Sequence, residues 1–144
     1  LTGQDIIDSQ KQYKRRNPNE KIFKFKRCVV HFCVDNNSVS MTTRIRGEET
    51  FFFPFNKELI NPPVKEGYRA KYFWEEILYP DSLIDILENF VHLSQAKEFI
   101  FNAKTDKIDV KTKEELIFPR YHQIDLIRKF RKTLDSFLLI RHII

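Results

Sequence analysis

The strongest chemical signal in the sequence is a basic segment at positions 11–27, which reads KQYKRRNPNEKIFKFKR. It holds eight Lys or Arg residues and one Glu, a local surplus of seven positive charges, whereas the rest of the chain holds 17 basic and 19 acidic residues. Lys and Arg neutralise phosphates by displacing condensed counterions, and aromatic rings lie between these charges. The segment therefore favours contact with a nucleic-acid backbone. The alternative is a solvated helix end followed by an edge strand whose lysines prevent further pairing.

The cysteines and histidines do not form the pattern of a metal or catalytic site. Cys28 and Cys33 are five residues apart, which puts them on opposite faces of a strand, so we expect two unpaired, buried or half-buried thiols in a reducing compartment. His31 shares a face with Cys33, but these ligands without a C-x-x-C pair do not make a zinc signature. The sequence contains no nucleotide-binding Gly-rich loop, no G-x-S-x-G and no H-E-x-x-H. These residues alone do not predict a self-sufficient enzyme.

The first half of the chain predicts a helix, a hairpin and an extended edge. Helical spacing over 3–16 follows a capping box of Thr2 and Asp5 and ends at Asn-Pro. The β-branched and aromatic runs at 27–35 and 38–45 predict a hairpin with an Asp-Asn-Asn turn. The run TFFFPF at 50–55 contains a proline, which predicts an edge strand or an extended segment.

The next part predicts a loop at 61–67, a helix over 68–79 and a second helix that begins at Ser82 with Asp85 as its capping box. Segment 94–115 is polar and is expected to connect two units. The second helix carries the clearest apolar stripe, formed by Leu83, Ile86, Leu87, Phe90 and Val91.

The last stretch predicts a helix from IFPRYHQ onward, followed by a strand. The terminal residues FLLIRHII have no polar face, which is typical of a buried strand in a parallel sheet. A chain that ends on such a strand is expected to be cut from something larger. The apolar side of the helix consists of Ile124, Ile127, Phe130, Leu134, Phe137 and Leu138.

Length and composition restrict the function classes. The 144 residues allow one domain or one and a fraction, which excludes a two-domain enzyme. Hydrophobic residues make up 42% and charged residues 31%, enough apolar surface to exclude a disordered tail. No apolar run approaches the roughly 20 residues that span a bilayer, and the N-terminus lacks a signal-peptide pattern. We expect a cytoplasmic protein of mixed α/β class.

Four blocks of the sequence resemble, in the family's order, the motor and nuclease (R) subunit of bacterial type I restriction enzymes, which are ATP-dependent DNA translocases. The blocks are LTGQDIIDSQKQYKRRNP, CVVHFCVDNNSVSMTTRIRGEETFFFPFN, NPPVKEGYRAKYFWEEILYPDSLIDILENFVHL and IFPRYHQIDLIRKF.

The resemblance implies an internal piece of that subunit. Residues 1–93 would be the back half of a PD-(D/E)xK nuclease domain, 94–115 a connector, and 116–144 the start of a superfamily 2 motor. The chain would begin just after the catalytic Glu-x-Lys strand and end just before the P-loop, so it would hold no catalytic acid and be inactive alone. ATP and Mg²⁺ would serve the whole subunit and would not bind stably to this piece.

The resemblance also assigns site residues and partners. Tyr13 matches the tyrosine of a Gln-x-x-x-Y motif that assists cleavage, although Ser9 stands in the Gln position. IFPRYHQ resembles an adenine-reading Q-motif, which makes Gln123 the base-reading residue, because an amide can both donate to and accept from the adenine edge. Its flanking residues would be Phe118, Arg120 and Tyr121. The expected DNA contacts are Lys11, Lys14, Arg15, Arg16, Lys24, Lys26 and Arg27.

The implied partners are double-stranded DNA and the modification and specificity subunits of the same complex. Because strands would be missing from such a piece, self-association is also expected. The alternative to this family is a separate nucleic-acid-binding or partner-binding module without catalysis, which would use the basic segment and the TFFFPF run as its surface.

Overall fold

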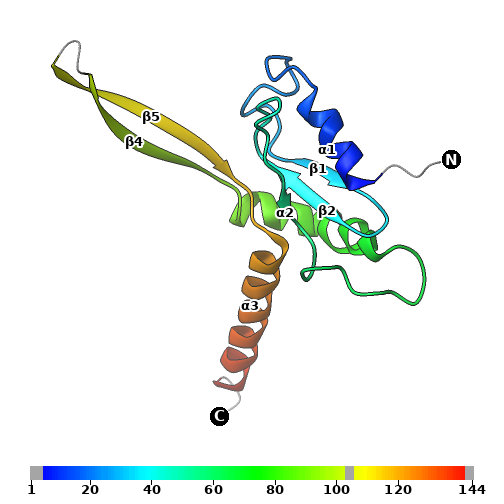
Figure 1. Cartoon of the computed structure of the whole chain (residues 1–144). Helices are drawn as coiled ribbons and strands as arrows, with labels where there is room; N and C mark the ends of the chain where they lie inside the picture. The colour runs from blue at the N-terminus through cyan, green and yellow to red at the C-terminus, as the bar shows by residue number, and fades with distance from the viewer. Residues whose placement is uncertain (1–4, 103–105, 142–144) are drawn as a thin grey trace.

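A computed structural model describes residues 5–102 and 106–141 of the chain. The elements run from an N-terminal helix through a small sheet and short helices to a long hairpin and a C-terminal helix (Figure 1). Their bounds are α1 (Ile6–Lys14), β1 (His31–Val34), β2 (Val39–Thr42), β3 (Phe53–Pro54), η1 (Arg69–Lys71), η2 (Phe73–Ile77), α2 (Pro80–Asn89), β4 (His92–Asn102), β5 (Lys107–Ile117) and α3 (Tyr121–Arg141).

The first half of the chain forms the predicted helix, hairpin and edge strand, all shorter than expected. Asp5 caps α1, since its carboxylate accepts a hydrogen bond from the N–H of Asp8 at 2.9 Å. Thr2 lies outside the described residues. Asp35 closes the predicted turn by accepting from the N–H groups of Asn37 and Ser38, and β3 pairs with β2 as the edge of the antiparallel order β1-β2-β3.

The two faces of this sheet are covered by different elements. On one face, Val39 and Met41 pack with the short helices and the start of α3 in the main core. On the other face, His31 and Cys33 lie opposite Thr42 and Ser40, and α1 covers them. All four residues of β2 are therefore buried, although the sequence alternates apolar and polar residues there.

The predicted helix over 68–79 is split into a 3₁₀ turn, η1, and a π-helical turn, η2. Tyr72 and Ile77 are buried, while Trp74 is exposed. The predicted start of the next helix at Ser82 is wrong. Helix α2 begins at Pro80, because proline suits the first helical position, where its missing N–H has no partner to lose.

Within the segment 94–115, which was expected to connect two units, the described residues 94–102 and 106–115 belong to a long hairpin of two strands. Strands β4 and β5 pair along their whole length, from His92 opposite Ile117 to Asn102 opposite Lys107. The hairpin extends away from the rest of the chain (Figure 1). The residues of the hairpin are mostly exposed on both faces. The polar sequence therefore reflects strands that contact solvent on both sides.

The predicted buried strand at 137–144 is wrong for the residues that the structure describes. Helix α3 continues through Arg141, and 142–144 lie outside the described residues. The described sheets are antiparallel and leave no parallel neighbour for this segment, whereas a helix satisfies its own backbone hydrogen bonds. Along α3, Ile124 is fully buried, but Phe130 and Phe137 are exposed.

The architecture is mixed α/β with two small antiparallel sheets, in agreement with the predicted class and not with a parallel sheet. Among the described helices, none has the length and apolar character needed to cross a membrane.

Candidate functional site

The basic segment 11–27 is the end of α1 followed by a series of turns, so the edge strand of the alternative interpretation does not form within it. Its basic side chains are exposed, except for Lys14, which is half-buried. Lys26 holds a positive φ of 72°, a left-handed conformation that ordinary side chains seldom adopt. The segment therefore presents its charges from a compact loop.

An aromatic cluster holds this loop against the sheet. The ring of Tyr13 lies 6.2 Å from that of Phe23, 5.6 Å from His31 and 6.0 Å from Phe52, measured between centroids. Burial raises the pKa of Tyr13, with the nearby thiols adding to the effect, and burial lowers the pKa of His31. Tyr13 thus packs as a half-buried anchor of the basic segment.

The nearby cysteines have the environments expected from the sequence. Cys33 is fully buried beneath α1 and Cys28 is half-buried, and both are free. Burial raises the pKa of the Cys33 thiol, with Ser9 and Ser40 as its hydrogen-bond partners. Cys33 is not placed to act as a reactive nucleophile, because it is buried and its raised pKa keeps the thiol protonated.

Two of the predicted DNA contacts already have acidic partners. Lys11 lies 3.5 Å from Asp8 on α1, and Lys26 lies 2.6 Å from Glu114 on β5. The hydrogen bond from Lys26 lowers the pKa of Glu114. The basic residues without an acidic partner among the described residues are Lys14, Arg15, Arg16, Lys21, Lys24 and Arg27.

A cavity of about 390 Å³ lies between the sheet, the base of the hairpin and the start of α3. Three of the four predicted nucleotide contacts line it, namely Phe118, Arg120 and Gln123. Its volume falls within the roughly 300–1,000 Å³ of small-molecule sites. The other residues that matter for its chemistry are Phe25, Arg44, Arg46, Glu49, Phe51, Phe53, Glu114 and Glu115.

Two arginine side chains in the cavity wall lie over aromatic rings. The guanidinium of Arg120 is 4.7 Å from the centroid of Phe53, and that of Arg44 is 4.6 Å from Phe25. Such contacts stabilise a flat guanidinium in one orientation, and a guanidinium can stack on planar groups. The cavity thus combines stacking surfaces with positive charge.

Gln123 has a structural role at the start of α3. Its side-chain Oε1 accepts a hydrogen bond from the backbone N–H of Arg120 at 2.8 Å, as in a capping box. Its side-chain amide nitrogen has no partner among the described residues, so this donor is the group that can meet a ligand in the cavity. The carboxamide is therefore held in one orientation by its oxygen.

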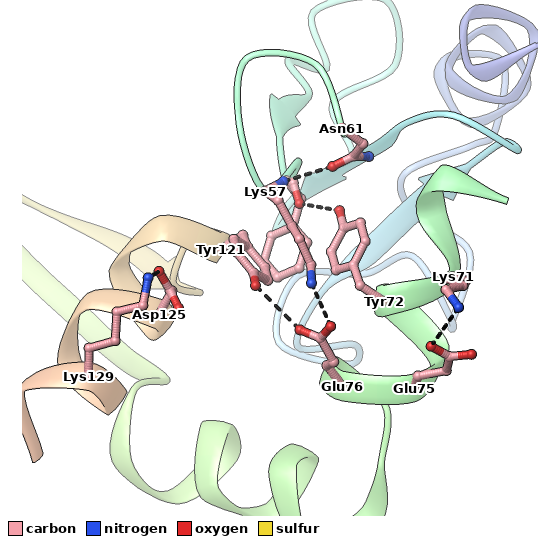
Figure 2. Close-up of polar contacts among 10 residues, drawn as sticks. Lys57, Asn61, Lys71, Tyr72, Glu75, Glu76, Tyr121, Asp125 and Lys129 are labelled. Atoms are coloured by element: carbon pink, nitrogen blue, oxygen red, sulfur yellow. Dashed lines mark hydrogen bonds and ion pairs between the residues drawn. The ribbon is translucent and has the colours of Figure 1, made fainter. Parts of the chain in front are cut away.

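Tyr121 does not line the cavity. Its hydroxyl donates to Glu76 at 3.3 Å, Glu76 pairs with Lys57, and the ring packs on Tyr72 (Figure 2). Burial, followed by the charge of Glu76, raises the pKa of Tyr121 to about 12. This residue joins α3 to η2 and lies outside the cavity that Phe118, Arg120 and Gln123 line.

The charges around the cavity leave it basic. The carboxylates of Glu114 and Glu115 form ion pairs with Lys26 and Lys113, at 2.6 Å and 2.9 Å. Their pKa values are lowered by those hydrogen bonds. Two of the three lining acids are thus neutralised by lysines, whereas the three lining arginines, Arg44, Arg46 and Arg120, keep their charge.

Sequence reasoning missed Arg44, Arg46 and Phe53 as cavity residues. The two arginines alternate after β2 and lie on the same side, and Phe53 belongs to the edge strand beside it. Their spacing was a signal, but the cavity that they line is completed by residues from a distant part of the chain. Within 5–102 and 106–141, no group of three His, Cys, Asp or Glu side chains is arranged to hold a metal ion.

Comparisons with protein-family models, with curated proteins and with solved structures find no match to this chain.

Proposed function

We propose that this chain is part of the motor and nuclease subunit of a bacterial type I restriction enzyme. In this role the basic segment contacts the phosphate backbone of DNA, and the cavity contacts the adenine of a nucleotide bound by the complete motor. The proposal is supported by the four sequence blocks that resemble this subunit and by the positions of two groups of side chains.

The observation that carries the proposal is the proximity of the two predicted sites. Phe25 and Lys26 belong to the basic segment, yet Phe25 lines the cavity and Lys26 binds Glu114 in its wall. Arg120 and Gln123 line the same cavity from the start of α3. A DNA-contacting loop and a base-contacting helix start therefore share one wall, an arrangement that suits a protein whose DNA contacts respond to nucleotide.

For the base, the wall offers stacking and a donor. The face of Arg120 that does not lie on Phe53 can stack on a purine, and the amide nitrogen of Gln123 can donate to an adenine ring nitrogen. The Gln123 oxygen already accepts one hydrogen bond from the Arg120 N–H and keeps a second lone pair that can accept from the adenine amino group. ATP would supply the energy for translocation when bound to the whole subunit.

The DNA contact is tested by binding to a duplex over a range of salt concentrations. Lys24→Ala with Arg27→Ala removes two exposed charges from the basic segment. The matched control, Lys65→Ala with Arg69→Ala, removes two exposed charges from the region 61–71, far along the sequence from it. We expect the first variant to bind more weakly and with a shallower salt dependence, and the control to bind like the unchanged chain. Equal binding by all three proteins would contradict the DNA contact.

The base contact is tested separately, because it is expected to be weak in this chain. The side-chain amide signal of Gln123, followed by nuclear magnetic resonance, is expected to shift with millimolar AMP more than with GMP. Arg120→Ala should remove the shift through loss of stacking, worth about 0.5–2 kcal/mol. Gln12, an exposed glutamine on α1, provides a reference signal. Equal shifts of both glutamines would contradict the base contact and would favour the module without nucleotide specificity.

A further inference from the structure

Two apolar surfaces of this chain lie outside the core and outside the cavity. The hairpin patch consists of Phe99, Phe101, Ile108 and Val110, and the helix stripe consists of Leu126, Ile127, Phe130, Leu134 and Phe137. Every one of these side chains is at least 40% exposed. Soluble monomers rarely expose contiguous apolar patches above a few hundred Å².

The hairpin patch is one face of the outer half of the hairpin. Phe99 is opposite Val110 and Phe101 is opposite Ile108, so the four side chains point to the same side. A hairpin of two strands is marginally stable alone in water and gains stability when an apolar face is covered. A surface that covers the patch would therefore stabilise the hairpin.

The helix stripe lies on a different side of α3 from its buried start. Ile124 is fully buried in the core, and the stripe follows at helical spacing through Phe130 to Phe137, two turns further on. Arg128 and Arg131 bind Asp85 on α2 from a neighbouring side of the helix. The helix is thus fixed at its first half and presents an uncovered apolar side beyond it.

The hairpin does not cover its own helix. Strands β4 and β5 and helix α3 extend in different directions from the junction at 118–120 (Figure 1). The hairpin patch extends over three residues of each strand, roughly 7 Å, and the helix stripe over 126–137, roughly 17 Å, so the patch can cover part of the stripe. Two apolar surfaces that do not meet within one chain can meet between two.

We propose that two copies of this chain associate through a reciprocal contact, in which the hairpin patch of each copy covers the helix stripe of the other. Such a contact has two-fold symmetry: each copy contributes both surfaces, so no apolar patch is left free to add a third copy. The four exposed phenylalanines, each with roughly 200 Å² of surface of which about two-thirds is exposed, would bury on the order of 1,000 Å² in the dimer. The aliphatic neighbours bring the total toward the roughly 1,200–2,000 Å² of stable interfaces. This inference is independent of the proposed DNA and nucleotide contacts.

The test uses analytical ultracentrifugation of the full chain and of two single variants, Phe99→Asp in the hairpin patch and Phe130→Asp in the helix stripe. The unchanged chain is expected to be a dimer at micromolar concentration, and each variant alone a monomer, because each breaks both contacts of its own homodimer. Leu59→Asp, at a side chain that is 94% exposed in a loop, is the control and should remain a dimer.

Mixing the two variants distinguishes the reciprocal contact from other dimers. The intact hairpin of the Phe130→Asp chain can cover the intact helix of the Phe99→Asp chain, so the mixture should regain a heterodimer with one of the two contacts. A hairpin-to-hairpin or helix-to-helix dimer predicts no such recovery. A monomeric unchanged chain, a dimer insensitive to both substitutions, or a mixture that stays monomeric would overturn the proposal. Circular dichroism of each variant would identify a loss of folding, in which case Phe101→Ser and Leu134→Ser replace them.

Discussion

Asp85 fixes helix α3 to helix α2, and its removal should destabilise the fold by about 2 kcal/mol. Its carboxylate accepts hydrogen bonds from Arg128 at 2.9 and 3.2 Å, from Arg131 at 3.1 Å and from Asn89 at 3.0 Å. A hydrogen bond to a charged group contributes about 1.5–3 kcal/mol when shielded from water and an exposed ion pair about 0.2–1 kcal/mol. The side chain of Asp85 is 28% exposed, so the combined contribution of its hydrogen bonds to the free energy of unfolding lies between these limits.

The measurement is urea unfolding of the Asp85→Ala variant. A loss of about 2 kcal/mol, with a slope of roughly 2 kcal/mol per molar urea, lowers the midpoint by about 1 M. The control is Asp125→Ala, whose exposed pair with Lys129 lies within one helix turn and should cost no more than about 0.5 kcal/mol. Equal midpoints for Asp85→Ala and the unchanged chain would refute the reasoning.

The same variant has a pH signature. Burial would raise the pKa of Asp85, but hydrogen bonds from Arg128, Asn89 and Arg131, together with the charge of Arg128, lower it overall. A carboxylate with a lowered pKa stabilises the fold fully above its unfolded value, near pH 4, and loses that contribution as the pH falls through the folded value. The difference in urea midpoint between the unchanged chain and the Asp85→Ala variant should therefore be constant above pH 5 and shrink below pH 4.

Three further predictions concern the core and the aromatic cluster. Tyr72→Phe removes a 2.7 Å hydrogen bond to the carbonyl of Phe55, which should cost about 1–2 kcal/mol and lower Tm by about 3–8 °C; an unchanged Tm would contradict a buried bond. His31 is neutral when buried, so stability should fall as the pH drops through its unfolded pKa near 6.5, and His31→Gln should flatten this dependence in urea titrations from pH 7.5 to 5. Ellman's reagent should modify Cys28 in the folded chain but Cys33 only after unfolding, and Cys28→Ser should abolish the fast reaction.

The sequence predicted the parts of the fold that local chemistry determines. The helix after Asp5, the turn closed by Asp35 and the edge strand at Pro54 follow from capping, side-chain hydrogen bonds to the turn and the missing proline N–H. Each of these signals acts within a few residues. These signals can therefore be recognised in the sequence without knowledge of how the rest of the chain folds.

The errors arose where a local pattern supports two structures. The apolar residues from Phe137 onward are compatible with a buried strand or a helix, and only the absence of a parallel neighbour among the described strands separates the two. Strands β4 and β5 are mostly exposed on both faces, and their apolar alternation is confined to a short part of the outer half, so the segment as a whole reads as polar. Asp85 resembled a capping residue, but it binds arginines 43 and 46 positions away.

The candidate site was partly predictable. Phe118, Arg120 and Gln123 came from one short block and do lie together, whereas Tyr121 in the same block packs elsewhere. The side chains that complete the cavity come from three separated parts of the chain. Whether these side chains come together depends on how the sheet packs against α3. No local sequence pattern encodes that packing.

The proposal of a DNA-contacting subunit is tested most directly by the salt dependence of duplex binding. Six basic side chains of the segment 11–27 lack an acidic partner among the described residues, which predicts a slope of log K against log salt near −5 if all of them contact phosphates. Replacing Lys24 and Arg27 by Ala should reduce the magnitude of the slope by about 2, while replacing Lys65 and Arg69 should leave it unchanged. A slope near zero for the unchanged chain, or the same slope for both double variants, would contradict the account.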